Sequence, residues 1–531
     1  MARCDDTGSI TYAAATIASS NPCSMLRNIF SNWVAIVIIG AVAFLMTPFL
    51  IHHLGNLEFG IWMLVSSICG YSGLLEFGLR ATLQRYVARF RGLNDRESLN
   101  QVFMTALLLT IISGLLIFVV MVVLAWILPG FFGLQGERRH DFSVLLVVMG
   151  LTLSVTLVSL LLKSYLCGFQ RFELYNLNVV AFTVAQAIAS VMVLRMGHGV
   201  VGMGAVTLAL TLCFIPWDWQ MVRRVDPGLR LHWRSPTAKR GKEILGFGWW
   251  MFLNSTGIRL RTYTDSLVIA RVLTVALITP FSVAGRLMQY FEPAITSIAS
   301  PMLPVMSELD GLRRHAELQR FFLQATKLTT VFTLLIASIL VLDSQLLLRV
   351  WVGEEFASVY LLVLILLVGY VLELSQRPSV MALMALGRHR ALGGWTLGEG
   401  LANLILSVYW GRKYGLVGVA WGTTIPLVVV KLTLQPWYTL RALRLPALAY
   451  IQESLARAVL VCALFLICAY TLMKMFPPLG IVGLVGMFTL QLALFGLITW
   501  VVGLTAQERS QLGQRSRRWI SDRGFATVAG V

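Results

Sequence analysis

Long apolar runs separated by short polar segments follow one another along almost the whole chain. Each run has about the 20 residues that an α-helix needs to cross the hydrocarbon core of a bilayer. The pattern predicts an all-α polytopic membrane protein with fourteen spans. They are expected at 29–51, 58–79, 101–129, 142–162, 175–195, 199–217, 245–270, 278–303, 322–347, 358–376, 391–411, 415–438, 455–475 and 480–503.

Composition supports this interpretation of the apolar pattern. Of the 531 residues, 57% are hydrophobic and 13% are charged, and the mean hydropathy is +0.77. The net charge of +18 would suggest a nucleic-acid partner in a soluble protein. Here, however, most of the 43 Lys and Arg lie at the termini and in alternate connections, as the positive-inside rule describes. We therefore expect both termini to be cytoplasmic and no nucleic acid to bind.

Motifs for cofactors and catalysis are missing from the sequence. The seven cysteines are scattered, with no CxxC pair and no histidine at metal-ligand spacing, so no metal or cofactor is expected. No nucleotide-binding loop or Ser/His/Asp set is found. The longest external connection, around 130–141, is too short to fold into a catalytic domain. These features disfavour an enzyme.

A repeat relates the two halves of the chain. One offset superimposes five features of the first half on identical residues of the second. They are Tyr71 on Tyr290, Gly92-Leu93 on Gly311-Leu312, Leu99 on Leu318, Phe103 on Phe322 and Gly168 on Gly387. The repeat predicts two homologous six-helix bundles, related by a pseudo-two-fold axis along the membrane normal and followed by two further helices.

The repeat and the loop composition together define the expected domains. They are a disordered cytoplasmic N-terminus at 1–28, in which Met25 is an alternative start, a first bundle at 29–217, a basic cytoplasmic linker at 218–244, a second bundle at 245–438, two extra helices at 439–503 and a basic cytoplasmic tail at 504–531. Amphipathic helices on the cytoplasmic surface are expected at 79–100 and 303–320.

The seventh predicted span differs from the others because it carries charge near its middle, at Arg259 and Arg261. On insertion scales a central arginine costs about 2.5 to 3.5 kcal/mol. Arg261 can pair with Asp265 four residues later, whereas Arg259 has no acid three or four residues away. Arg259 is therefore the better candidate to bind an anion. The alternative is that both arginines pair with carboxylates on other helices, and the available ones are Glu76, Glu292, Glu373 and Glu399.

Further arginines extend the candidate cationic site. Arg286, in the eighth span, can face Arg259 in the same bundle or pair with Asp265 or Glu292. Arg80 and Arg85 lie at the inner mouth of the second span, where they would attract an anion or simply reflect the positive-inside bias.

Carboxylates within spans are candidates for energy coupling. Glu399 lies among Gly393-Gly394, Gly398 and Gly400, so we expect it to be buried. A buried carboxyl can bind a proton or Na⁺, or it can pair with an arginine. The predicted set of coupling-ion sites or charge partners is Asp265, Glu399, Glu292 and Glu76. Coupling to a proton gradient, a sodium gradient or the membrane potential all remain open.

Several short motifs resemble a known family. They are Phe59-Gly60-Ile61-Trp62, the segment Leu74-Leu75-Glu76-Phe77-Gly78-Leu79-Arg80-Ala81, Arg85-Tyr86, and Cys167-Gly168-Phe169-Gln170-Arg171. Together with the twelve-plus-two span pattern, they resemble the polysaccharide exporters of the multidrug/oligosaccharidyl-lipid/polysaccharide (MOP) superfamily. Among these are the flippases of lipid-linked O-antigen-type oligosaccharides.

This resemblance implies the substrate, the location and the partners. The substrate would be an undecaprenyl-diphosphate-linked oligosaccharide, moved from the inner to the outer leaflet of the bacterial cytoplasmic (inner) membrane for O-antigen, capsule or exopolysaccharide assembly. Partners would be membrane lipids, a polysaccharide polymerase and glycosyltransferases. The two extra helices would offer a groove for the lipid tail.

Two other transport functions share this fold. A cation-coupled multidrug exporter is one, although the first predicted span, 29–51, contains no carboxylate for a cationic drug. A flippase for the peptidoglycan precursor lipid II is the other, and it would differ only in its cargo. A polymerase or ligase acting on the same lipid-linked sugars is the enzymatic alternative.

Overall fold

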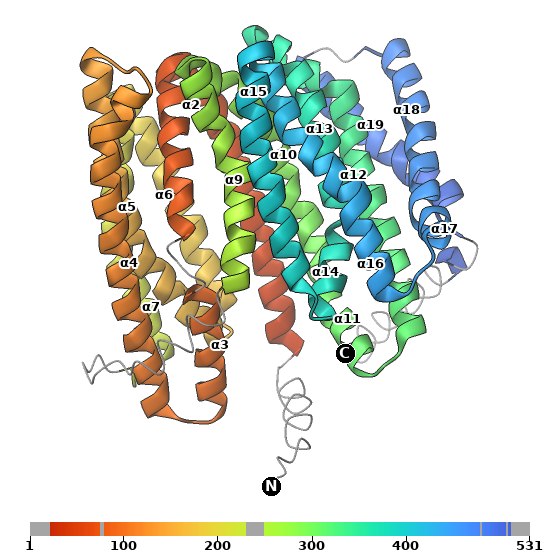
Figure 1. The fold of residues 1–531 in the computed structure, drawn as a ribbon, viewed down its shortest axis with the longest axis horizontal. Helices are drawn as coiled ribbons and strands as arrows, with labels where there is room; N and C mark the ends of the chain where they lie inside the picture. Colours follow the sequence, from red (N-terminus) through yellow and green to blue (C-terminus); the bar gives the residue numbers. More distant parts are fainter. Residues whose placement is uncertain (1–21, 75–78, 230–248, 478–479, 506–507, 511–531) are drawn as a thin grey trace, which may run out of the picture. The chain divides into compact units, whose positions relative to one another are not determined.

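The computed structural model describes residues 22–74, 79–229, 249–477, 480–505 and 508–510, and this part of the chain is helical without strands (Figure 1). The all-α polytopic class is therefore confirmed for these residues. Several expected features lie outside the described residues. They are residues 1–21 of the N-terminal segment, Glu76, the linker from 230 to 244, the start of the second bundle at 245–248, and most of the C-terminal tail.

The chain divides into two compact units, Met1–Thr279 and Pro280–Val531, which are considered separately below. The division falls after the charged seventh span, later than the boundary expected at 245. The helices of the first unit are α2 (Pro22–Gly70), η1 (Tyr71–Leu74), α3 (Leu79–Gly92), α4 (Arg96–Phe131), α5 (Gly136–Gly168), α6 (Phe172–Arg195), α7 (Gly199–Val225), α9 (Trp249–Val272) and η2 (Val275–Leu277).

The second unit begins within α10 (Ile278–Ala299). Its other helices are α11 (Met302–Gly311), α12 (His315–Trp351), η3 (Glu354–Val359), α13 (Tyr360–Ser375), α14 (Arg377–Ala385), α15 (His389–Val429), η4 (Val430–Leu434), α16 (Gln435–Leu443), α17 (Ala447–Tyr450), η5 (Ile451–Ala456), α18 (Arg457–Met475), α19 (Gly480–Ile498) and η6 (Thr499–Gly503).

Ten helical segments of the described chain are long and apolar enough to cross a membrane. Two of them, Phe30–Leu74 and Arg390–Leu443, contain 45 and 54 residues, about twice the length of one crossing. Each is interrupted at a glycine of positive φ, Gly55 (71°) or Gly415 (62°), a conformation that other residues rarely adopt.

Fourteen crossings would result if each interrupted segment crossed twice and α9 and α10 crossed as well. These two helices have 24 and 22 residues, which is enough to span the bilayer. Charged side chains, such as Arg259 in α9 and Arg286 in α10, lower their mean hydropathy. The number fourteen, like the two-bundle arrangement, stays a prediction.

The predicted repeat is visible in the local structure of each unit. Both amphipathic segments contain a helix, α3 or α11, which ends in the same turn before a long helix. The turn places Asn94 (φ 52°) and Arg313 (φ 55°) in the left-handed region. Three backbone hydrogen bonds close the turn in each unit. In the first unit the N–H groups of residues 93, 94 and 95 donate to the carbonyls of 89, 91 and 90, and in the second those of 312, 313 and 314 donate to the carbonyls of 308, 310 and 309.

The same repeat supplies matching core residues. Leu99 and Phe103 are buried in the first unit, and their counterparts Leu318 and Phe322 are buried in the second. Phe103 packs edge-on against Tyr165, with ring centroids 5.3 Å apart. The two homologous segments therefore share backbone geometry and apolar anchors, which supports the repeat deduced from the sequence.

Small residues allow α9 and η2 to approach α2 closely. A Cβ added at Gly70 would collide with the aromatic ring of Tyr263 on α9. One added at Gly60 would collide with the backbone carbonyl of Val275. Close packing through glycines is common between membrane helices, where dispersion contacts replace the hydrophobic driving force.

Replacing Gly70 by alanine should therefore destabilise the first unit. The added methyl group meets a rigid ring, and overpacking of this kind costs about 1–3 kcal/mol. Gly40→Ala, in the first segment of the same helix, is the control because nothing lies within 4 Å of its new Cβ. We expect a lower melting temperature of the detergent-solubilised protein for Gly70→Ala only. Equal melting temperatures would contradict the close contact.

Candidate functional site

Arg259 binds the C-terminal end of α2. Its Nη1 donates a hydrogen bond to the carbonyl oxygen of Gly70, the last residue of that helix. Its Nε lies 3.4 Å from Ser255 Oγ, one turn earlier on α9. The last carbonyls of a helix have no N–H partner within the helix and carry the negative end of its dipole, so a guanidinium is well placed there.

The residue after Gly70 is also fixed by α9. The Tyr71 hydroxyl lies 2.6 Å from Thr264 Oγ1, and the rings of Tyr71 and Tyr263 lie 5.9 Å apart. Gly73 gives the guanidinium of Arg259 its space, because a Cβ there would overlap that group. Arg259 and Tyr263 are four residues apart on α9 and share a face. They contact Gly70 and Gly73, and Thr264, the residue after Tyr263, contacts Tyr71.

The charge of Arg259 has no carboxylate partner among the described residues. Its contacts there are to a backbone carbonyl and a serine hydroxyl, both of which are neutral. The side chain is half-buried, and a guanidinium stays charged in proteins. Glu76, which the sequence offered as a partner, lies outside the described residues. A half-buried cation with neutral partners inside a membrane is a functional-site candidate.

The other predicted cations have different environments. Arg261 and Arg286 are half-buried and Asp265 is buried, and each of the three has an interaction partner. Arg80 and Arg85 are exposed near the beginning of α3. The structure thus places Arg259, Arg261 and Asp265 on one helix, and the role of each in binding stays a prediction.

In the second unit, Glu292 belongs to a small charge cluster. It accepts a hydrogen bond from Arg377 at the beginning of α14. Arg377 also lies 3.7 Å from Glu373 on α13. The cluster therefore joins three helices of this unit, α10, α13 and α14, and gives Glu292 a structural partner.

Glu399 is buried, as its glycine-rich surroundings predicted, and it lies 3.0 Å from Lys431 Nζ. Lys431 belongs to the π-helical turn η4 and also donates to Gln435. Gln435 donates in turn to the carbonyl of Gln376, whose amide donates to Tyr450 at 2.9 Å. Wide π-helical turns occur frequently at functional sites. A continuous buried polar network therefore surrounds Glu399.

Another buried ion pair, in the first unit, was not expected from the sequence. Asp218 on α7 is fully buried, and its Oδ2 accepts from Ser159 at 2.5 Å and lies 3.9 Å from Lys163 Nζ. Its Oδ1 has no hydrogen-bond partner among the described residues. Lys163 follows directly after the fourth predicted span, 142–162, a position from which a lysine side chain commonly reaches the membrane surface. The signal available in the sequence was an acid directly after an apolar run, which alone identifies no partner.

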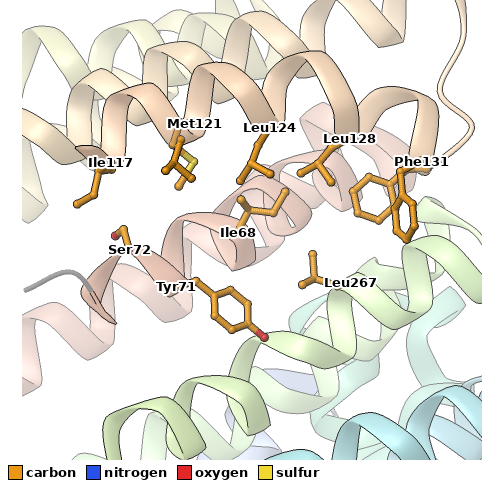
Figure 2. Close-up of a pocket in the computed structure, with 11 residues that line it drawn as sticks. Ile68, Tyr71, Ser72, Ile117, Met121, Leu124, Leu128, Phe131 and Leu267 are labelled. Atoms are coloured by element: carbon orange, nitrogen blue, oxygen red, sulfur yellow. The ribbon is translucent and has the colours of Figure 1, made fainter. Parts of the chain in front are cut away.

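An apolar cavity of about 300 Å³ lies beside Tyr71 in the first unit. Figure 2 shows Ile68, Tyr71 and Leu267 on one side of it and residues of α4 on the other. The lining residues are almost all apolar: Ile68, Tyr71, Ser72, Ile117, Val120, Met121, Leu124, Leu128, Phe131, Phe132 and Leu267. This cavity could not be predicted from the sequence, because it forms where three separate segments meet.

The fold is shared with transporters of known structure. The inward-facing conformation of a multidrug resistance MATE family transporter of the MOP superfamily matches with a TM-score of 0.64 and 20% identity, over 76% of this chain and 99% of that one. The lipid II flippase MurJ, in an inward closed conformation, matches with a TM-score of 0.68 and 15% identity, over 90% and 98%. These matches show that the chain shares the fold of these two proteins.

The family follows from the sequence itself. A family model described as polysaccharide biosynthesis protein matches residues 54–361, more than half of the chain. The chain belongs to this polysaccharide biosynthesis protein family, as its motifs suggested. The putative O-antigen transporter of Shigella flexneri is 21% identical over 78% of this chain and 98% of its own length. The uncharacterized membrane protein EpsK of Bacillus subtilis (strain 168) is 22% identical over 78% and 83%.

The pair Lys163–Asp218 provides a test of the first unit. Lys163→Met leaves a buried carboxylate without its cation, a change that typically costs about 3–5 kcal/mol. The double variant Lys163→Met/Asp218→Asn removes both charges and should regain most of that loss. Arg314→Met, which breaks an exposed pair with Glu317, is the control and should cost less than about 1 kcal/mol.

Thermal unfolding of the purified protein in detergent measures all three variants. A double variant no more stable than Lys163→Met would show that the two side chains do not interact.

Proposed function

We propose that the protein is a flippase that moves an undecaprenyl-diphosphate-linked oligosaccharide from the inner to the outer leaflet of the bacterial cytoplasmic membrane. The observation that carries this proposal is Arg259, half-buried in α9 with only neutral partners among the described residues. Membership of the polysaccharide biosynthesis family and the MOP-superfamily fold support the substrate class and the transport function.

The chemistry of the substrate matches an arginine in this place. A diphosphate carries negative charge and many oxygen acceptors, and the planar guanidinium fork binds such oxygens in pairs. The hydrogen bonds to the Gly70 carbonyl and to Ser255 Oγ leave further N–H donors of Arg259 to bind phosphate oxygens. Arg261 and Arg286 would add positive charge, and Arg80 and Arg85 would attract the diphosphate at the cytoplasmic entrance.

The proposal includes orientation, coupling and partners. Both termini would be cytoplasmic, because Lys and Arg concentrate on that side. Glu399 and Asp265 would bind the coupling proton or sodium ion, or serve only as charge partners. The protein would act as a transporter rather than an enzyme, and it would hand its cargo to a polysaccharide polymerase after glycosyltransferases have assembled it on the cytoplasmic face.

Arg259→Ala should abolish translocation in cells that depend on this protein. We expect at least a tenfold loss, the consequence of about 1.4 kcal/mol of lost interaction with the diphosphate. Arg259→Lys should retain part of the activity, because lysine keeps the charge but loses the planar fork. The measurement is the fraction of lipid-linked oligosaccharide that a membrane-impermeant lectin reaches in spheroplasts.

Arg195→Ala, an exposed arginine at the end of α6, is the matched control and should behave as wild type. Membrane levels of each variant are compared by immunoblot. If the sugar reaches the outer leaflet normally without this protein and accumulates unpolymerised, the flippase proposal is wrong and a polymerase takes its place. If only the peptidoglycan precursor is stranded inside, the cargo is lipid II.

A further inference from the structure

We propose that the apolar cavity between α2, α4 and α9 holds the part of the polyprenyl chain nearest the diphosphate. The inference rests on the proposed function and adds to it a specific site for the lipid portion of the substrate. The volume of the cavity, about 300 Å³, is at the lower end of the range for ligand pockets. It lies entirely in the first unit and uses no residue of the two extra helices at 439–503.

The position of the cavity next to Arg259 identifies the occupant. Tyr71 lines the cavity, and the carbonyl of the preceding residue, Gly70, accepts the hydrogen bond from Arg259. Leu267 lines it from α9, eight residues after Arg259 and therefore about 12 Å farther along the helix. The guanidinium thus contacts Gly70, and the next residue, Tyr71, lines the apolar cavity. This arrangement fits a molecule in which a diphosphate is joined directly to a hydrocarbon chain.

The cavity also opens towards lipid. Val120 and Phe131, two of its lining residues, are 39% and 51% exposed and lie on the outer face of α4. That face is apolar along its length, with Leu116, Val123 and Ile127 exposed as well. A chain would thus enter from the bilayer along this face of α4, where the guanidinium of Arg271 on α9 lies 5.1 Å from the centre of the Phe131 ring. Among the described residues that line the cavity, the polar side-chain groups are the hydroxyls of Tyr71 and Ser72.

The direction from Arg259 to the cavity suggests when the chain is held. With the termini in the cytoplasm, α9 runs outward, so the cavity is on the outer side of Arg259. A lipid of the inner leaflet likewise has its head towards the cytoplasm and its chain pointing outward. The cavity therefore suits the substrate before it is turned over. Because the bilayer is as apolar as the cavity, affinity for the chain would come from close packing against the lining residues rather than from the hydrophobic effect.

The experiment measures binding of farnesyl diphosphate, inorganic pyrophosphate and farnesol to the purified full-length protein in detergent. Leu124→Trp fills the cavity, and Leu124→Ala enlarges it as a second variant should the larger residue impair folding. Val123→Trp, at the residue before Leu124 on α4, is the matched control, because Val123 is exposed and does not line the cavity. Size-exclusion profiles and melting temperatures establish that each variant is folded.

The wild type should bind farnesyl diphosphate at least tenfold more tightly than pyrophosphate. Leu124→Trp should remove that difference without changing pyrophosphate affinity, Leu124→Ala should reduce it, and Val123→Trp should preserve it. Unchanged farnesyl diphosphate affinity in both Leu124 variants would overturn the inference. So would farnesol binding as tightly as farnesyl diphosphate, because the cavity would then be an ordinary site for membrane lipid.

Failure of the inference can be separated from failure of the proposed function. If the lectin assay shows translocation that depends on Arg259 while the Leu124 variants bind as wild type, only the site of the chain is wrong. If the wild type neither translocates the lipid-linked sugar nor binds either diphosphate, the proposed function fails and the inference fails with it.

Discussion

The absence of water in the bilayer interior requires every polar group there to find a partner within the protein. Arg259 satisfies this requirement with the last carbonyl of α2, where a helix end leaves acceptors without in-helix partners. The contact is possible because Gly70 and Gly73 leave space for Tyr263 and for the guanidinium itself. The close packing of α2 against α9 therefore also determines where the guanidinium of Arg259 lies. The cavity lies next to this contact, because Tyr71 lines it.

The buried charges at Asp218, Arg259 and Glu399 have different kinds of partner. In the first unit, Asp218 has a hydroxyl and a distant ammonium group as partners, and Arg259 has only neutral ones among the described residues. In the second, Glu399 and Lys431 lie in direct contact within a network of amides and a tyrosine. A pair in close contact is costly to separate, which favours a structural role for this network.

Apolar periodicity and self-similarity predicted the helical class, the positions of most spans and the repeat, because these are properties of local sequence. The turns after α3 and α11 agree down to their hydrogen bonds. Partners across helices could not be predicted in this way. Lys163 follows an apolar run in the sequence, and nothing in that position identifies Asp218 as its partner. The sequence likewise does not identify Lys431 as the partner of Glu399. The cavity depends on three segments that are distant in sequence.

The duplicated turn has a consequence for how such a chain can evolve. Asn94 and Arg313 occupy the same left-handed position although their side chains differ, so the backbone pattern has outlasted the residues that formed it. The buried acids, in contrast, do not recur: one half has Asp218 and the other Glu399, at positions that the repeat does not relate. The turn is thus present twice, whereas neither buried acid has a counterpart in the other half that could replace it.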